Sequence, residues 1–116
     1  MKIDIIPVAK PRMTKRDVWA QRPAVMRYRA FCDELRLKYK KTLPAEVQLI
    51  FYIPMPISWS KKRRVSLFRM PHQQKPDIDN LCKSVMDALS DDDAYIHELH
   101  AMKFWDYRGT IEINDL

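Results

Sequence analysis

The residues best suited to chemistry lie in an acidic segment, residues 77–93, which contains six aspartates and a single basic residue, Lys83. Asp77 and Asp79 are two residues apart, where an extended or helix-capping backbone can point both side chains the same way. Clustered carboxylates repel one another, and a hard divalent cation relieves that repulsion. Mg²⁺, with Mn²⁺ as a substitute, prefers oxygen ligands and keeps waters that contact phosphate. We therefore expect a metal site that activates water for phosphodiester hydrolysis.

Lys83 and Asp93 are the other candidates for this site. Lys83 follows Asp79 by one helical turn and can bring positive charge to a scissile phosphate. Asp93 ends an aspartate triplet that precedes a predicted strand. It can return towards Asp77 and Asp79 if helix and strand pack antiparallel with a suitable offset. The alternative is that Asp77 and Asp79 only cap a helix and that the triplet is a solvated turn.

Basic residues are concentrated in two other blocks. Residues 10–41 hold eleven Lys or Arg against three acids, and residues 61–75 hold six and no acid. With a formal net charge of +6, this separation favours a surface that binds nucleic-acid phosphates without sequence preference. Trp59 and Phe68 accompany the second block and either stack on unpaired bases or simply anchor the core or a loop. The predicted DNA-binding residues are Lys10, Arg12, Lys15, Arg16, Lys61, Lys62, Arg63, Arg64, Arg69 and Lys75.

Composition limits the class of protein. The 116 residues suit one domain, residues 1–116, and a hydrophobic share of 47% is ample for a core. Gly109 is the only glycine, which excludes a Gly-rich phosphate loop and the nucleotide cofactors that need one. Cys32 and Cys82 have no nearby cysteine and are expected to be buried thiols in a reducing compartment. No stretch approaches the ~20 apolar residues of a membrane span, so we expect a cytoplasmic protein.

Two amphipathic helices are predicted from apolar residues at helical spacing. The first begins at Pro23, a favourable first-turn residue. Its apolar face is expected to comprise Val25, Tyr28, Phe31 or Cys32, Leu35 and Tyr39. The second begins near Asp77 or Asp79, either of which can cap it. Its apolar face is expected to comprise Ile78, Leu81, Val85 and Leu89.

Strands are predicted on both sides of these helices, from β-branched and aromatic residues bounded by turn residues. The predicted strands are residues 2–8, 47–53, 94–104 and 110–114, with a turn at 106–109. Trp59 to Met70 can include a helical turn, but Pro71 and Pro76 break it, so residues 57–76 are predicted to be mostly loop. This order predicts an α+β fold, a two-layer sandwich in which helices cover one face of a small mixed β-sheet.

A specific signature runs through the acidic segment. It reads Pro76-Asp-Ile-Asp-Asn-Leu81, then Lys83, Asp87-Ala-Leu89 and Asp92-Asp93-Ala94 before a predicted strand. This spacing resembles the core signature of the RusA family of Holliday-junction resolvases, which occur widely in phages and prophages. The resemblance implies a two-layer α+β fold, a homodimer, and Mg²⁺-dependent paired nicks across four-way junctions in DNA recombination and repair.

The same resemblance implies roles for individual residues. Asp77, Asp79 and Asp93 would be the metal-binding catalytic carboxylates, and Lys83 the essential lysine. The short connection before the triplet leaves open whether Asp92 or Asp93 is the third ligand. Branched DNA is the implied partner. The competing function is a non-catalytic basic DNA-binding protein of a phage, whose aspartates form only a turn.

Overall fold

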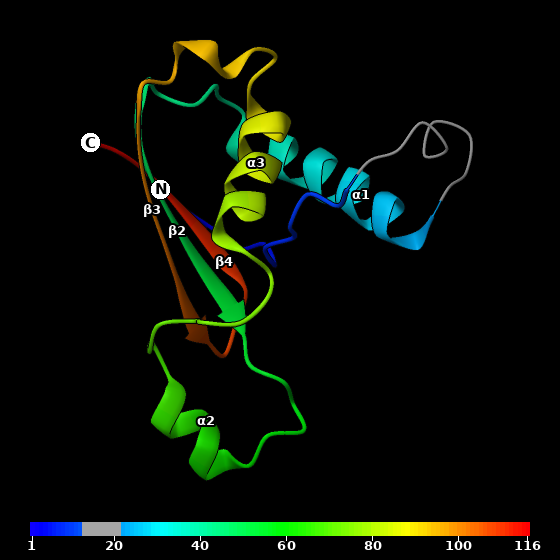
Figure 1. The fold of residues 1–116 in the computed structure, drawn as a ribbon, viewed down its shortest axis with the longest axis vertical. Helices are drawn as coiled ribbons and strands as arrows, with labels where there is room; N and C mark the ends of the chain where they lie inside the picture. The colour runs from blue at the N-terminus through cyan, green and yellow to red at the C-terminus, as the bar shows by residue number, and fades with distance from the viewer. Residues whose placement is uncertain (13–21) are drawn as a thin grey trace.

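Across residues 1–12 and 22–116, the part of the chain that the computed structural model describes, four strands form one mixed sheet (Figure 1). The strands are β1 (Lys2–Ile3), β2 (Glu46–Pro54), β3 (Glu98–Asp106) and β4 (Thr110–Asp115). Their order in the sheet is β1-β4-β2-β3, and β2 and β3 are parallel while the other neighbours are antiparallel. The predicted α+β fold with a mixed sheet is confirmed.

Helices α1 (Pro23–Tyr39) and α3 (Ile78–Leu89) cover one face of this sheet (Figure 1). All the predicted apolar positions of α1 are buried: Val25, Tyr28, Phe31, Cys32, Leu35 and Tyr39. In α3, Leu81, Val85 and Leu89 are buried as predicted. Ile78 is a correction, because it is 36% exposed and the core begins one turn later, at Leu81.

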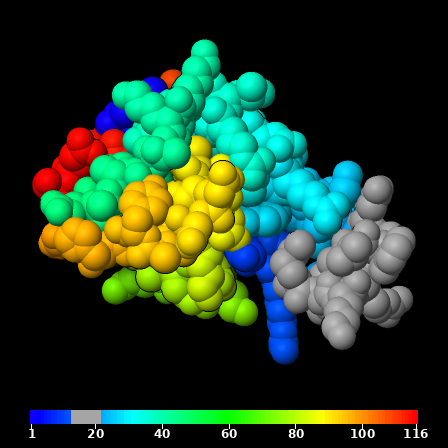
Figure 2. Space-filling view, turned by 90° about the horizontal axis from the view of Figure 1, so that it is seen from above, coloured from blue at the N-terminus to red at the C-terminus, as the bar shows by residue number. Residues whose placement is uncertain are grey.

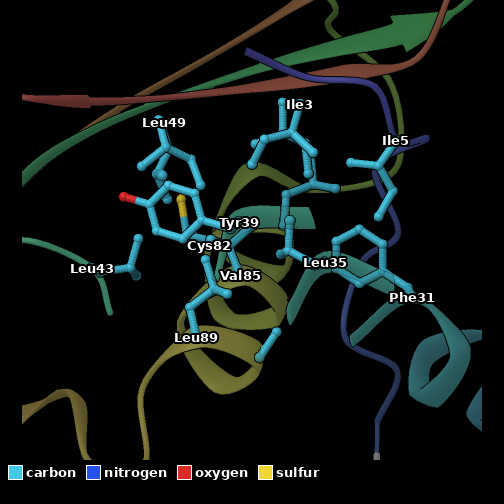
Figure 3. Close-up of a cluster of buried hydrophobic side chains, with 14 of the residues drawn as sticks. Ile3, Ile5, Phe31, Leu35, Tyr39, Leu43, Leu49, Cys82, Val85 and Leu89 are labelled. Carbon is cyan, nitrogen blue, oxygen red and sulfur yellow. The ribbon is translucent and has the colours of Figure 1, made fainter. Parts of the chain in front are cut away.

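The space between helices and sheet is filled by one hydrophobic cluster (Figure 3). Leu35 of α1 and Val85 of α3 point towards the strands and are fully buried, as is Leu49 of β2. Because removing apolar surface from water is the main favourable term in folding, this contact fixes which side of each helix faces the sheet. No helix among the described residues is long and apolar enough to span a membrane.

A short helix, α2 (Lys61–Leu67), stands where mostly loop was predicted. It begins because Ser60 caps it, with the Ser60 hydroxyl accepting the N–H of Arg63 at 3.2 Å. It lies beyond the end of the sheet, away from α1 and α3 (Figure 1). The prolines at 71 and 76 come after this helix, so they do not prevent it.

Two predicted strands are shorter than expected. β1 ends at Ile3, which pairs with Ile111, one residue after the start of β4. β3 begins at Glu98 and not at residue 94, because residues 93–95 form a short 3₁₀ helix, η2 (Asp93–Tyr95). The Tyr95 hydroxyl donates to the Leu43 carbonyl at 2.6 Å, which ties η2 to the segment before β2.

Gly109, in the turn between β3 and β4, touches the N-terminal segment. A Cβ at this position would lie 2.7 Å from Cα and 2.8 Å from Cγ1 of Ile6. Since the nearest atom belongs to the backbone, the two segments must separate before any side chain fits. The single glycine of the sequence therefore allows the β3–β4 turn to pack closely against Ile6, and it does not form a phosphate-binding loop.

We expect Gly109→Ala to lower the free energy of unfolding by about 1–3 kcal/mol, as overpacking does in a filled site. Lys62→Ala, at an exposed position of α2, should change it by less than about 0.5 kcal/mol. Urea denaturation followed by circular dichroism measures both. Equal stability of Gly109→Ala and wild type would contradict the close approach to Ile6.

Candidate active site

Asp77 and Asp79 lie together at the N-terminus of α3. Asp77 occupies the capping position with an extended backbone but accepts no capping hydrogen bond, and Asp79 lies in the first turn. Both carboxylates are exposed, beside the positive end of the helix dipole, which favours negative charge. One turn further, Lys83 Nζ lies 4.0 Å from Asp79 Oδ2. The structure thus brings three of the four predicted catalytic residues to one exposed helix end.

Lys103 of β3 holds the backbone that leads into Asp77. Its Nζ donates to the carbonyl oxygens of Gln74 at 2.6 Å and Pro76 at 2.7 Å. Burial lowers the pKa of the Lys103 amino group, and the nearby Asp77 carboxylate opposes that shift. Lys103 therefore joins the sheet to the start of α3 and adds positive charge beside Asp77. Sequence reasoning missed it, because a lone lysine in a strand gives no local signal of this long-range contact.

Asp93 lies at the other end of α3. The helix has 12 residues, which is about 18 Å of axial rise, and Asp93 begins η2 beyond its C-terminus (Figure 1). β3 does run back towards the start of α3, but the residue that arrives there is Lys103, ten positions after Asp93. The expected return of Asp93 to Asp77 and Asp79 therefore does not occur within one chain.

The aspartate triplet is exposed on the surface of the η2 end. Figure 2 looks onto this end, where the segment that joins α3 to β3 lies open in yellow and orange. Asp92 Oδ1 accepts the N–H of Ala94 at 3.0 Å, so this carboxylate caps η2. Asp93 is exposed as the first residue of η2. The Asp92 carboxylate is thus engaged within its own turn.

The donors at the start of α3 suit a hydrated divalent cation. Asp77 and Asp79 offer oxygen ligands, and Mg²⁺ is often held by one or two carboxylates together with substrate phosphates and water. Among the described residues no group of three His, Cys, Asp or Glu side chains is placed to hold a metal. The described part of one chain therefore places two carboxylates, those of Asp77 and Asp79, at the start of α3.

Asp87, on the exposed side of α3, ties three segments together. Its Oδ2 accepts the Tyr28 hydroxyl at 3.0 Å and lies 2.5 Å from Lys10 Nζ. The backbone N–H of Lys10 also donates to the backbone carbonyl oxygen of Asn80 at 3.0 Å. Burial, followed by Cys32 and Asp87, raises the pKa of the Tyr28 hydroxyl, which keeps it protonated as a donor. α1 and the N-terminal segment thus hold α3 in place.

The aromatic residues near α2 anchor it to the end of the sheet. The Trp59 ring packs on Trp105 with centroids 4.9 Å apart, and Phe68 stacks on Tyr107 at 5.2 Å. The Arg63 guanidinium lies 3.9 Å from the centroid of the Trp59 ring. These contacts favour the anchoring interpretation over stacking on bases.

The predicted DNA-binding residues differ in how far their charge is already paired. Lys10 is paired with Asp87, and Arg69 with Asp106 at 2.7 Å. Lys75, in contrast, is exposed and lines an open hollow of about 440 Å³ beside Asp77, Asn80, Ala9 and Pro76. Lys61, Lys62 and Arg12 are also exposed. Lys15 and Arg16 lie outside the described residues.

Comparison with known proteins identifies one family. The sequence model of the family Endodeoxyribonuclease RusA matches residues 3–114 of the chain. No curated protein and no solved structure matches it significantly. The matched segment contains both halves of the candidate site, from the start of α3 to η2.

We expect Asp87→Ala to lower the free energy of unfolding by about 1–3 kcal/mol, because it leaves the Tyr28 hydroxyl without its acceptor. Tyr28→Phe should cost less in the Asp87→Ala background than in wild type. Asp91→Ala, at an exposed position, should be neutral within about 0.5 kcal/mol. Denaturant melts of the four proteins in the double-mutant cycle measure the coupling. Strictly additive costs would contradict the Asp87 connection.

Proposed function

The chain belongs to the RusA endodeoxyribonuclease family, whose members resolve Holliday junctions, and on this basis we propose that it is a Mg²⁺-dependent enzyme that makes paired symmetric nicks in branched DNA. The observation that carries the proposal is the exposed pair Asp77 and Asp79 beside Lys83 at the N-terminus of α3. Family membership weighs against the competing function, a DNA-binding protein without catalysis. Because such DNA is intracellular, the proposed site of action is the cytoplasm of a bacterial cell.

Each site residue has a proposed part in phosphodiester hydrolysis. Asp77 and Asp79 hold Mg²⁺, or Mn²⁺ in its place. Asp93, the third carboxylate, lies past the other end of α3 in one chain, so it can join them only from a second subunit. A bound ion supplies an activated water and stabilises negative charge on the phosphate and the leaving oxygen. Lys83 donates to an oxygen of the scissile phosphate. Lys103 is a positioning residue, which fixes the backbone carbonyl of Pro76 and hence the direction of Asp77.

The basic residues are proposed to hold the DNA backbone across this end of the molecule. Lys75 lies in the hollow next to Asp77, and Lys61 and Lys62 project from α2, the helix at the same end (Figure 1). Contacts of this kind act on phosphates and carry no sequence information. A four-way junction has two-fold related strands, which a two-fold dimer matches, so we propose a homodimer.

Asp77→Asn and Asp79→Asn should each reduce Mg²⁺-dependent nicking of a synthetic four-way junction by more than about a hundredfold. The loss of a metal ligand accounts for the lost cleavage. DNA binding should stay intact or become tighter, because each change also removes a negative charge that repels phosphate. Asp91→Asn is the matched control and should cleave normally. EDTA should abolish nicking by wild type. Cleavage by Asp77→Asn within about tenfold of wild type would contradict the assignment.

Replacing Lys61 and Lys62 by Gln should weaken binding to all junction sequences alike. The slope of log affinity against log salt should become shallower by roughly 0.9 for each phosphate that the variant no longer neutralises. Lys40 and Lys41, beyond the C-terminus of α1, give a control pair with the same change of charge. Arg63 and Arg64 are left in place, because their guanidinium groups lie over Trp59 and Tyr107. Equal slopes for both double variants would mean that α2 faces away from the DNA.

A further inference from the structure

Residues 56–68, which comprise α2 and the turn before it, form an arm whose two ends meet on the sheet. At the start, the Met55 N–H donates to the Asp106 carbonyl at 2.9 Å. At the end, the Arg69 N–H donates to the Trp105 carbonyl at 2.8 Å, and Arg69 Nε lies 2.7 Å from Asp106 Oδ2. A compact surface segment with adjacent ends is frequently functional. We call residues 56–68 the α2 arm.

The α2 arm is firmly anchored, yet it adds nothing to the hydrophobic core. On its inner side Trp59 packs on Trp105, and the Arg64 guanidinium lies 5.1 Å from the centroid of the Tyr107 ring. None of its residues is buried, and the core cluster of the described residues contains none of them. Arg69, where the arm ends, has φ 62°, a left-handed value that a non-glycine residue keeps only where its surroundings hold it. The arm is therefore a projection with a fixed direction, and its outer side chains can contact another molecule.

The outer surface of the α2 arm combines apolar and basic side chains. Val65 is 60% exposed and Ile57 is 91% exposed. On a helix, the surface neighbours of Val65 include the residues three and four positions earlier, which are Lys62 and Lys61. The arm contains no acidic residue and four basic ones: Lys61, Lys62, Arg63 and Arg64.

This combination fits nucleic acid better than it fits a protein partner. The cores of protein interfaces are depleted of lysine, whereas here an aliphatic side chain lies beside two lysines. Nucleic acid offers both complements, because the faces of its bases are apolar and its phosphates are anionic. The α2 arm is thus suited to contact base faces and the phosphates next to them.

Base faces are accessible only where stacking is interrupted. In a continuous duplex each base pair is covered by its neighbours, so an apolar side chain has to separate two stacked pairs in order to enter. At the branch point of a four-way junction the strands pass from one helix to another, and the base pairs that border it have faces that can open. An apolar side chain therefore gains more contact at a branch point than along a duplex.

The segment after the α2 arm connects it to the candidate active site. Residues 69–76 run along the edge of β3, where the His72 N–H donates to the Lys103 carbonyl at 3.1 Å. Lys103 Nζ in turn donates to the Pro76 carbonyl at 2.7 Å, directly before Asp77. The α2 arm projects from the end of the molecule at which α3 begins (Figure 1). Its position relative to the carboxylates is therefore set through β3.

We propose that the α2 arm recognises the branch point of four-way DNA through Val65 and Ile57, which pack on the open base faces. Lys61 and Lys62 contact the phosphates that flank these bases. This inference rests on the proposed function, because the DNA that the arm contacts is the substrate of the same site. It makes the arm a determinant of structural selectivity, since a duplex offers the phosphates but not the open base faces. It also fixes where the carboxylates meet the strand relative to the branch point.

The proposal is tested by comparing junction and duplex affinities in EDTA, where cleavage does not interfere. Val65→Asn should lower affinity for a synthetic four-way junction at least about fivefold, because it removes an apolar contact with base faces. Its affinity for a linear duplex of the same sequence should change less than about twofold, since the phosphate contacts remain. Ile57→Asn should act in the same direction. Fluorescence anisotropy with labelled DNA measures both affinities.

Leu37→Asn is the matched control, because Leu37 is an apolar residue of α1 that is 71% exposed and lies outside the α2 arm. Its ratio of junction to duplex affinity should equal that of wild type. Val65→Thr keeps the branched shape of valine and repeats the test if Val65→Asn melts below wild type. A ratio in the Val65 variants equal to that of wild type would overturn the proposal. Conversion of a wild-type oligomer to a smaller species by Val65→Asn, seen by sedimentation, would overturn it too, since a second copy would then cover this surface.

A base analogue reports the contact directly. 2-Aminopurine becomes brighter when it is unstacked, so wild type should raise its fluorescence beside the branch point and not in the middle of a junction arm. Val65→Asn at saturating concentration should raise it less, and Leu37→Asn should match wild type. The same signal from Val65→Asn and wild type would count against insertion at the branch point.

Nicking of the same junction with Mg²⁺ decides the proposed function separately. If wild type nicks junctions and the Val65 variants keep the wild-type affinity ratio, the role of the α2 arm is wrong and the proposed function stands. If wild type binds junctions without nicking them, the proposed function is wrong, and the affinity ratio still decides the role of the arm. Equal affinity of wild type for junction and duplex would overturn branch-point recognition whether or not the DNA is cut.

Discussion

The burial of one face of α3 between α1 and the sheet is the interaction on which the rest of the site depends. Leu81 and Val85 are fully buried, and burying each such side chain contributes about 1.5–3 kcal/mol. The helix cannot turn or slide without exposing them. Its polar side is therefore held in solvent, with Asp77 and Asp79 at one end and Asp93 past the other.

Polar contacts set the position of this helix more finely than the core does. Asp87 accepts a hydrogen bond from the Tyr28 hydroxyl of α1 and forms an ion pair with Lys10 of the N-terminal segment. Lys103 of β3 donates to the backbone of the loop before Asp77. Each contact joins segments far apart in the sequence, so together they fix the start of α3 relative to the sheet edge. The carboxylates themselves remain exposed, which suits their proposed contacts with metal, water and a DNA phosphate.

Local patterns in the sequence predicted much of this fold. The apolar spacing of α1 and the buried run of β2 are properties of neighbouring residues, and both elements form as predicted. The acidic pair and Lys83 also come together through one helical turn. α2 was predicted as no more than a helical turn within a loop. Ser60 caps the start of the helix, and Pro71 and Pro76 follow it without interrupting it. The positions of Lys103 and Asp93 relative to Asp77 depend on how the chain returns along α3 through η2 and β3. The spacing of residues within one helix or strand does not encode that return.

The most direct test of this account is cleavage of a mobile four-way junction, with the nicks mapped at nucleotide resolution beside a linear duplex of the same sequence. The account predicts Mg²⁺-dependent nicks at symmetry-related positions in two strands of like polarity, and an uncut duplex. Equal cutting of the duplex, or unrelated single nicks scattered over all four strands, would contradict it.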